Sequence, residues 1–122
     1  MSGTEYLADT NAIIYLLNGN ACMKPFLQKK LAVSVITFME LLSFSAMTAE
    51  EEMSIRQFMK LCEIITIDEQ IREKTIELRR INRIKLPDSI IAATAITQRL
   101  PLITADAGFF KIGGLQVEKL EP

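Results

Sequence analysis

The sequence predicts an α/β fold, in which a central parallel sheet of four to five short strands is flanked by helices. Three observations indicate this fold. Short apolar runs alternate with longer helical patterns along the chain, and this alternation is typical of a parallel sheet covered on both faces. The 122 residues suit one domain of the commonest size. No repeat, low-complexity tract or Pro/Gly-rich linker divides them, so we expect a single domain over residues 1–122.

The strands are predicted from short apolar runs that end at polar or turn residues. The run at 31–36, Leu-Ala-Val-Ser-Val-Ile, is rich in β-branched residues and is typical of a fully buried strand. In chain order, the expected strands are 6–8, 31–36, 62–67, 101–104 and, as a possible fifth, 116–118.

The helices are predicted from apolar residues at three- and four-residue spacing and from capping signals. Thr37 and Glu40 have the spacing of a capping box, which predicts a helix with Thr37 as its N-cap, and Thr48 with Glu51 repeats that signal. In chain order, the expected helical segments follow Asp9, follow Gly19-Asn20 to about Gln28, and begin at Thr37, Thr48, Asp68 and Pro87.

Histidine is absent from the chain, which excludes several classes of active site. A Ser-His-Asp triad, a Cys-His pair and any zinc site that uses imidazole are impossible. An enzyme with this composition must use carboxylates, lysine, tyrosine, hydroxyls, thiols or a bound metal. The net charge of −1 argues, taken alone, against a nucleic-acid partner, because phosphate binders usually carry a basic excess.

The sequence also predicts a soluble, cytoplasmic protein. The residues before the first apolar run carry no basic side chain, so we expect no signal peptide. Residues 31–47 are the most membrane-like segment, but Glu40 interrupts them and they fall short of the roughly 20 apolar residues of a membrane span. Cys22 and Cys62 form no CxxC pair and are expected to be reduced thiols.

Four acidic residues follow predicted strands or open the helix that leads into one: Asp9, Glu40, Asp88 and Asp106. Each has an ordinary structural explanation, as an N-cap (Asp9), as the capping-box partner of Thr37 (Glu40), at a helix N-terminus (Asp88) or in a turn (Asp106). A parallel sheet nevertheless brings its carboxyl ends to one edge, so we expect the four side chains to converge. Converging carboxylates repel one another unless a cation neutralises them, and oxygen ligands suit Mg²⁺ or Mn²⁺.

Four blocks of sequence surround these acids, namely residues 7–11 (LADTN), 35–40 (VITFME), 86–95 (LPDSIIAATA) and 102–110 (LITADAGFF). In their order and separations, the blocks resemble the PIN domain family, and within it the VapC-type toxins of bacterial and archaeal toxin–antitoxin pairs. The resemblance runs from about residue 5 to residue 120. It places the four acids at the family's four acidic positions without a departure. Four neighbours match positions that orient carboxylates or water: Thr10, Asn11, Thr37 and Thr104.

The resemblance implies an endoribonuclease that depends on Mg²⁺ or Mn²⁺ and leaves a 3′-hydroxyl and a 5′-phosphate. A bound divalent ion lowers the pKa of water and acts as a Lewis acid, which is chemistry that a chain without histidine needs. Asp9 and Asp88 are the expected direct ligands. Glu40 and Asp106 either bind the ion, directly or through water, or orient the attacking water. The resemblance also implies a homodimer and a VapB-like antitoxin, whose tail wraps the toxin near its active site.

Residues 72–85 contain six basic and two acidic side chains, a local charge of +4, and lead directly to Asp88. One interpretation is a basic rim that binds the phosphates of RNA, with Arg83 and Lys85 as the best candidates. The other is a solvated helix face. The −1 net charge therefore averages an acidic centre and a basic stretch, and it does not exclude a nucleic-acid partner.

Several alternatives stay open at this point. The segment after Thr37 is apolar on more than one face, which fits either a core helix or a surface shared with a second protomer or an antitoxin. Its apolar residues are Phe38, Leu41, Leu42, Phe44 and Met47. In function, the alternatives are a PIN-like nuclease of RNA processing, a phosphoacceptor receiver domain, and a module that binds RNA or protein without cutting.

Overall fold

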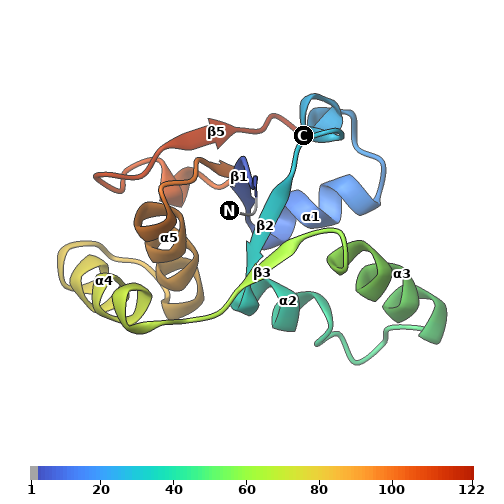
Figure 1. Ribbon diagram of the computed structural model, residues 1–122, viewed down its shortest axis with the longest axis horizontal. Helices are drawn as coiled ribbons and strands as arrows, with labels where there is room; N and C mark the ends of the chain where they lie inside the picture. Colours follow the sequence, from blue (N-terminus) through green and yellow to red (C-terminus); the bar gives the residue numbers. More distant parts are fainter. Residues whose placement is uncertain (1–2) are drawn as a thin grey trace.

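The structure is a computed structural model and describes residues 3–122 (Figure 1). Met1 and Ser2, on which part of the expectation of no signal peptide rests, lie outside the described residues. No helix among residues 3–122 combines the length and the apolar character that crossing a bilayer requires.

The centre of the molecule is a five-stranded sheet in which every neighbouring pair is parallel, as predicted. Its spatial order is β3-β2-β1-β4-β5, so the first strand lies in the middle. The strands are β1 (Tyr6–Ala8), β2 (Leu31–Ser34), β3 (Glu63–Ile65), β4 (Leu102–Thr104) and β5 (Val117–Lys119).

Five α-helices and two short 3₁₀ helices connect and follow the described strands. The capping box of Thr48 and Glu51 is present as predicted, and Asp68 caps the longer helix that follows it. The elements are α1 (Thr10–Leu17), η1 (Ala21–Phe26), α2 (Val35–Leu41), α3 (Ala49–Met59), α4 (Glu69–Ile81), α5 (Leu86–Gln98) and η2 (Ala107–Phe109).

The start of α2 differs from the prediction. The helix begins at Val35 and its N-cap is Ser34, whose hydroxyl accepts a hydrogen bond from the backbone N–H of Ile36. The prediction that Thr37 is the N-cap with Glu40 as its reciprocal partner is therefore wrong. Ser34 offers the same capping hydroxyl three residues earlier, at the true end of the strand, and Thr37 becomes a fully buried residue inside the helix.

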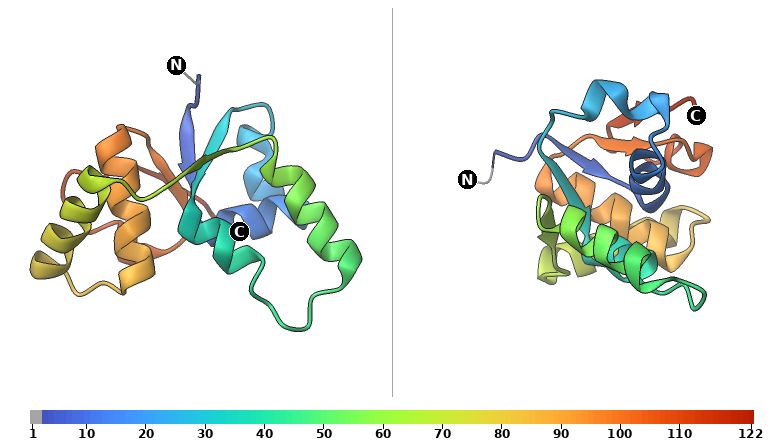
Figure 2. Two further views of the ribbon diagram at one scale, coloured as in Figure 1. Left: turned by 60° about the horizontal axis from the view of Figure 1, so that its bottom comes forward. Right: turned by 90° about the vertical axis from the view of Figure 1, so that its right-hand side faces the viewer.

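Both faces of the sheet are buried, and the strands alternate between two cores. Leu7 packs into the core beneath α4 and α5, whereas its neighbour Ala8 packs into the core beneath α1, η1 and α3. Ala32 and Val33 divide between the same two cores. Figure 2 (left) shows α4 and α5 on one side of the sheet and α1 and α3 on the other. This packing fixes the sheet edge at which the carboxyl ends of the strands meet.

Candidate active site

Asp9 joins the ends of two neighbouring strands. It follows β1 directly and caps α1, because its Oδ1 accepts a hydrogen bond of 2.8 Å from the backbone N–H of Ala12. Its Oδ2 accepts a hydrogen bond from the hydroxyl of Thr104 at the end of β4. The side chain is only 4% exposed. The predicted N-cap role is thus present together with a second contact that ties Asp9 to a residue 95 positions away.

Thr104 also connects Asp9 to Asp106. The Thr104 hydroxyl oxygen accepts a hydrogen bond of 3.0 Å from the backbone N–H of Asp106. The Oδ1 of Asp106 accepts a further bond of 2.8 Å from the backbone N–H of Gly108 and so holds the turn that opens η2. The rest of the Asp106 carboxylate faces outward, since this residue is exposed.

Glu40 is held by a short chain of hydroxyls. Thr10 Oγ1 donates to Glu40 Oε1 at 2.6 Å and lies 3.0 Å from Thr37 Oγ1. A hydroxyl has one proton and an ionised carboxylate has none, so Thr37 must donate to Thr10 for Thr10 to donate to Glu40. Thr37 therefore supports Glu40 through Thr10, in place of the capping contact that the sequence predicted.

Asp88 and Asn11 are less constrained. Asp88 is the third residue of α5 and is half-buried. Asn11 is exposed, and within residues 3–122 its side chain makes no hydrogen bond. Thr10, Thr37 and Thr104 thus contact the acids directly or in series, whereas the supporting role of Asn11 stays a prediction.

The pKa values of Asp9 and Asp88 respond to burial and to the charges of other carboxylates. Burial raises the pKa of Asp9 above its ordinary value, hydrogen bonds from Thr104 and Ala12 lower it, and the charges of Asp106 and Asp88 raise it. Burial also raises the pKa of Asp88, followed by the charges of Asp106 and Glu40, while Lys85 lowers it. The topology has therefore brought four negative charges into one region, where each added charge costs free energy.

This repulsion predicts that Asp88→Asn stabilises the metal-free protein. A carboxyl whose pKa is raised on folding contributes stability below its ordinary pKa, and that stability is lost as the pH rises through the raised value. At neutral pH the ionised side chain then opposes folding, and the neutral amide does not. Thermal unfolding in EDTA should give a higher Tm for Asp88→Asn than for wild type, and a smaller fall in Tm between acid and neutral pH. Asp68→Asn, at a helix N-cap, is the control, and an unchanged or lower Tm for Asp88→Asn would contradict the prediction.

The acids fit a divalent metal in donor chemistry, although they do not form a finished cage. Within residues 3–122, no three His, Cys, Asp or Glu side chains lie close enough together to hold an ion. The donors are all oxygens, as Mg²⁺ and Mn²⁺ prefer, and a cation would relieve the repulsion that raises the pKa values of Asp9 and Asp88. Both oxygens of Asp9 accept hydrogen bonds, whereas Glu40 and Asp106 each keep one oxygen that accepts none among residues 3–122 and is available to an ion.

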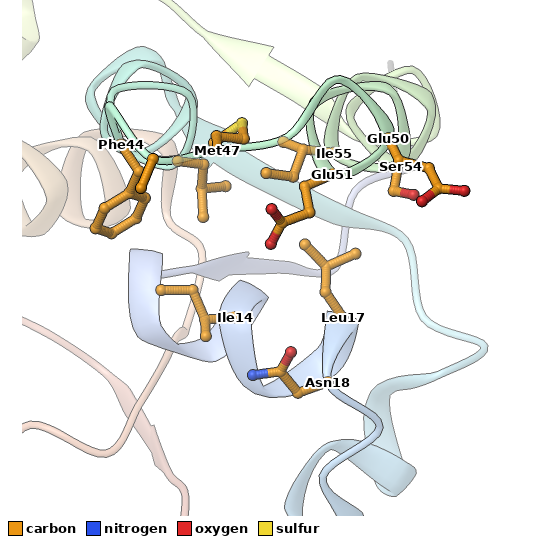
Figure 3. A pocket seen from close by; sticks show the side chains of 11 residues that line it. Ile14, Leu17, Asn18, Phe44, Met47, Glu50, Glu51, Ser54 and Ile55 are labelled. Atoms are coloured by element: carbon orange, nitrogen blue, oxygen red, sulfur yellow. The ribbon is translucent and has the colours of Figure 1, made fainter.

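A separate groove lies between α1 and α3, and none of the four acids lines it. Its volume is about 720 Å³. Figure 3 shows Ile14 and Leu17 on one wall facing Phe44, Met47 and Ile55 on the other, with Glu50 and Glu51 at the same end as Ile55.

The segment after Thr37 divides between the core and this groove. The helix ends at Leu41, which is 2% exposed and packs in the core, whereas Phe44 lies in the following loop and is 64% exposed. On the opposite wall, Ile14 and Leu17 belong to the apolar side of α1, and Leu17 is 37% exposed.

The comparisons with known proteins agree with this architecture. The PIN domain family matches residues 6–115. Among curated proteins, none matches this chain. A chain of a toxin–antitoxin complex from Klebsiella pneumoniae is 36% identical over 94% of this chain and 97% of that chain, with a TM-score of 0.81.

Two further solved structures are similar over nearly their whole length. A chain of VapBC-1 from nontypeable Haemophilus influenzae is 25% identical, covers 95% of this chain and 98% of its own, and has a TM-score of 0.80. A chain of VapBC2 from Rickettsia felis, in a crystal structure with a DNA fragment from the VapBC2 promoter, is 23% identical. It covers 97% of this chain and 100% of its own, and its TM-score of 0.81 shows the shared fold. The phosphoacceptor receiver alternative is thereby excluded. The chain belongs to the PIN domain family.

Proposed function

We propose that this chain is a divalent-metal-dependent endoribonuclease that acts in the cytoplasm as the toxin of a VapBC-type pair. The observation that carries the proposal lies at the carboxyl ends of β1 and β4, where Thr104 donates a hydrogen bond to Asp9 and accepts one from the backbone N–H of Asp106. Burial and the charges of other carboxylates raise the pKa values of Asp9 and Asp88, which supports the proposal. Membership of the PIN domain family and the likeness to a chain of a toxin–antitoxin complex support it. The two free cysteines favour a reducing compartment.

When bound, Mg²⁺ or Mn²⁺ supplies Lewis-acid stabilisation of charge on the phosphate and lowers the pKa of water. Asp9 and Asp88 are the proposed ligands, because two hydrogen bonds hold Asp9 and the charge of Asp88, at the start of α5, raises the pKa of Asp9. Glu40 uses one oxygen to accept from Thr10 and keeps the other to orient the attacking water or bind the ion. Asp106 likewise uses Oδ1 for Gly108 and keeps Oδ2 free.

Metal removal tests the nuclease. We expect the purified protein to cut RNA in the presence of Mg²⁺ or Mn²⁺ and to leave new 5′-phosphate ends, which sequencing of RNA 5′ ends detects. In excess EDTA the same protein should leave the RNA intact, because no side chain here replaces the Lewis acid. Cleavage that continues undiminished in EDTA would exclude the mechanism. RNA that stays intact in every condition would favour a module that binds without cutting.

The groove between α1 and α3 is the proposed docking site for the antitoxin. Its walls are apolar, and Glu50 and Glu51 at one end carry negative charge. An amphipathic segment that presents apolar side chains to the walls and a basic side chain to these acids fits it best. The toxin–antitoxin complexes among the similar structures support a protein partner of this kind. The homodimer that the resemblance implies stays a prediction, as does the choice between a toxin and a nuclease of RNA processing.

A further inference from the structure

A smaller pocket of about 280 Å³ adjoins the acids and carries both signs of charge. Arg83 and Lys85 line it from the loop before α5, and Asp88 and Asp106 line it from α5 and the end of β4. No ion pair within 4.0 Å joins any of these four side chains to another charge among residues 3–122. Opposite charges therefore face one small space without a direct ion pair, although Lys85 lowers the pKa of Asp88.

The other basic residues of the same stretch are engaged differently. On α4, Arg72 pairs with Glu73 at 3.1 Å and Lys74 pairs with Glu77 at 3.1 Å. The helix thus neutralises part of its own charge, as a solvated helix face does. Arg79, Arg80, Arg83 and Lys85 form no ion pair within 4.0 Å among residues 3–122, so the unpaired positive charge lies in the second half of the stretch. Of these four, only Arg83 and Lys85 line the pocket.

The loop that carries Arg83 and Lys85 is anchored to α4. Arg79 donates through Nε to the backbone carbonyl of Ile84 at 3.3 Å. Asn82 donates through Nδ2 to the carbonyl of Leu78 at 3.1 Å, and Ile84 packs against the core beneath α4 and α5. Figures 1 and 2 show α4 and α5 side by side, with this loop joining them. The two cationic side chains therefore project from a backbone that is already held in place, which reduces the entropy lost on binding.

We propose that this pocket is a phosphate subsite, in which Arg83 and Lys85 bind the phosphate of one nucleotide beside the acids. The inference rests on the proposed function. It replaces the basic rim expected from the sequence with a single defined subsite. The volume lies just under the range of about 300–1,000 Å³ typical of small-molecule pockets, which suits one nucleotide rather than a length of strand. Because Asp88 and Asp106 repel a phosphate, binding should be stronger when a divalent cation is present.

Titration with adenosine 5′-monophosphate, compared with adenosine, tests the subsite without any cleavage step. Calorimetry in Mg²⁺ should show binding of the monophosphate and little or none of adenosine. Arg83→Gln and Lys85→Gln should each weaken the binding of the monophosphate about tenfold, since each removes a charge-assisted hydrogen bond. Lys60→Gln makes the same change of charge at the end of α3, outside the pocket, and should leave the binding as it is.

The subsite is overturned if the wild type does not bind the monophosphate, if adenosine binds as tightly, or if the two pocket variants bind like Lys60→Gln. Thermal melts of all three variants establish that they are folded, as expected for exposed side chains. RNA cleavage by the same wild-type preparation separates the two proposals. Cleavage without selective binding of the monophosphate would support the nuclease proposal and contradict the subsite. Selective binding without cleavage would support the subsite and contradict the nuclease proposal.

Discussion

Asp9→Ala is expected to lower RNA cleavage by at least about a hundredfold, a loss in the range found when a group that stabilises charge in the transition state is removed. The variant removes a proposed metal ligand that two hydrogen bonds hold in position. It also removes the N-cap of α1 and leaves the buried Thr104 hydroxyl without its carboxylate, so its free energy of unfolding should fall by about 1–3 kcal/mol. The measurement is the initial rate of RNA cleavage in Mg²⁺, with the folded fraction determined by circular dichroism.

Asp68→Ala is the matched control for Asp9→Ala. Asp68 caps α4 through the same kind of bond, in which Oδ1 accepts from the backbone N–H of Ile71 at 2.8 Å, but it does not belong to the acidic group. This variant should lose a similar cap energy, about 0.5–2 kcal/mol, and keep its cleavage rate. If Asp68→Ala and Asp9→Ala lose activity to the same degree, Asp9 is a structural cap and the proposed site is wrong.

Phe44→Asp is expected to release the protein from its antitoxin without stopping RNA cleavage. Phe44 is 64% exposed and lines the groove, so a charge there should not unfold the chain. It should, however, oppose an apolar partner and add to the negative charge of Glu50 and Glu51. Loss of a central aromatic contact costs about 2 kcal/mol or more, which corresponds to roughly thirtyfold weaker binding. The measurement is the affinity for the small protein encoded by the neighbouring gene, together with RNA cleavage in its presence.

Leu61→Asp provides the comparison for the groove. Leu61 is 80% exposed and does not line the groove, so the substitution adds the same charge to the surface elsewhere. It should bind the partner like the wild type, and the partner should still inhibit its cleavage of RNA. Equal weakening by both variants would point to a general effect of charge, and no weakening by Phe44→Asp would place the partner on another surface.

Local sequence patterns were sufficient to predict the helices and strands, because the residues that form each pattern lie within a few positions of one another. The N-caps at Asp9 and Asp68 and the capping box at Thr48 were predictable, since a cap bonds to a backbone group two or three residues on. The same rule failed at Thr37, because Ser34 is also a suitable N-cap. The strand ends at Ser34, and this residue is the N-cap of α2. Two residues that both suit a cap cannot be ranked without knowing where the sheet stops.

The sequence by itself determined the α/β class and the order of its elements, singled out the four acids as candidates, and excluded histidine chemistry. Only the tertiary structure decided how these parts meet. The bond from Thr104 to Asp9 depends on β4 lying beside β1, and the two hydrogen bonds that link Thr37, Thr10 and Glu40 depend on α2 lying beside α1. The physical reason is that hydrophobic periodicity and capping act along the chain, whereas strand order brings together residues that are dozens of positions apart.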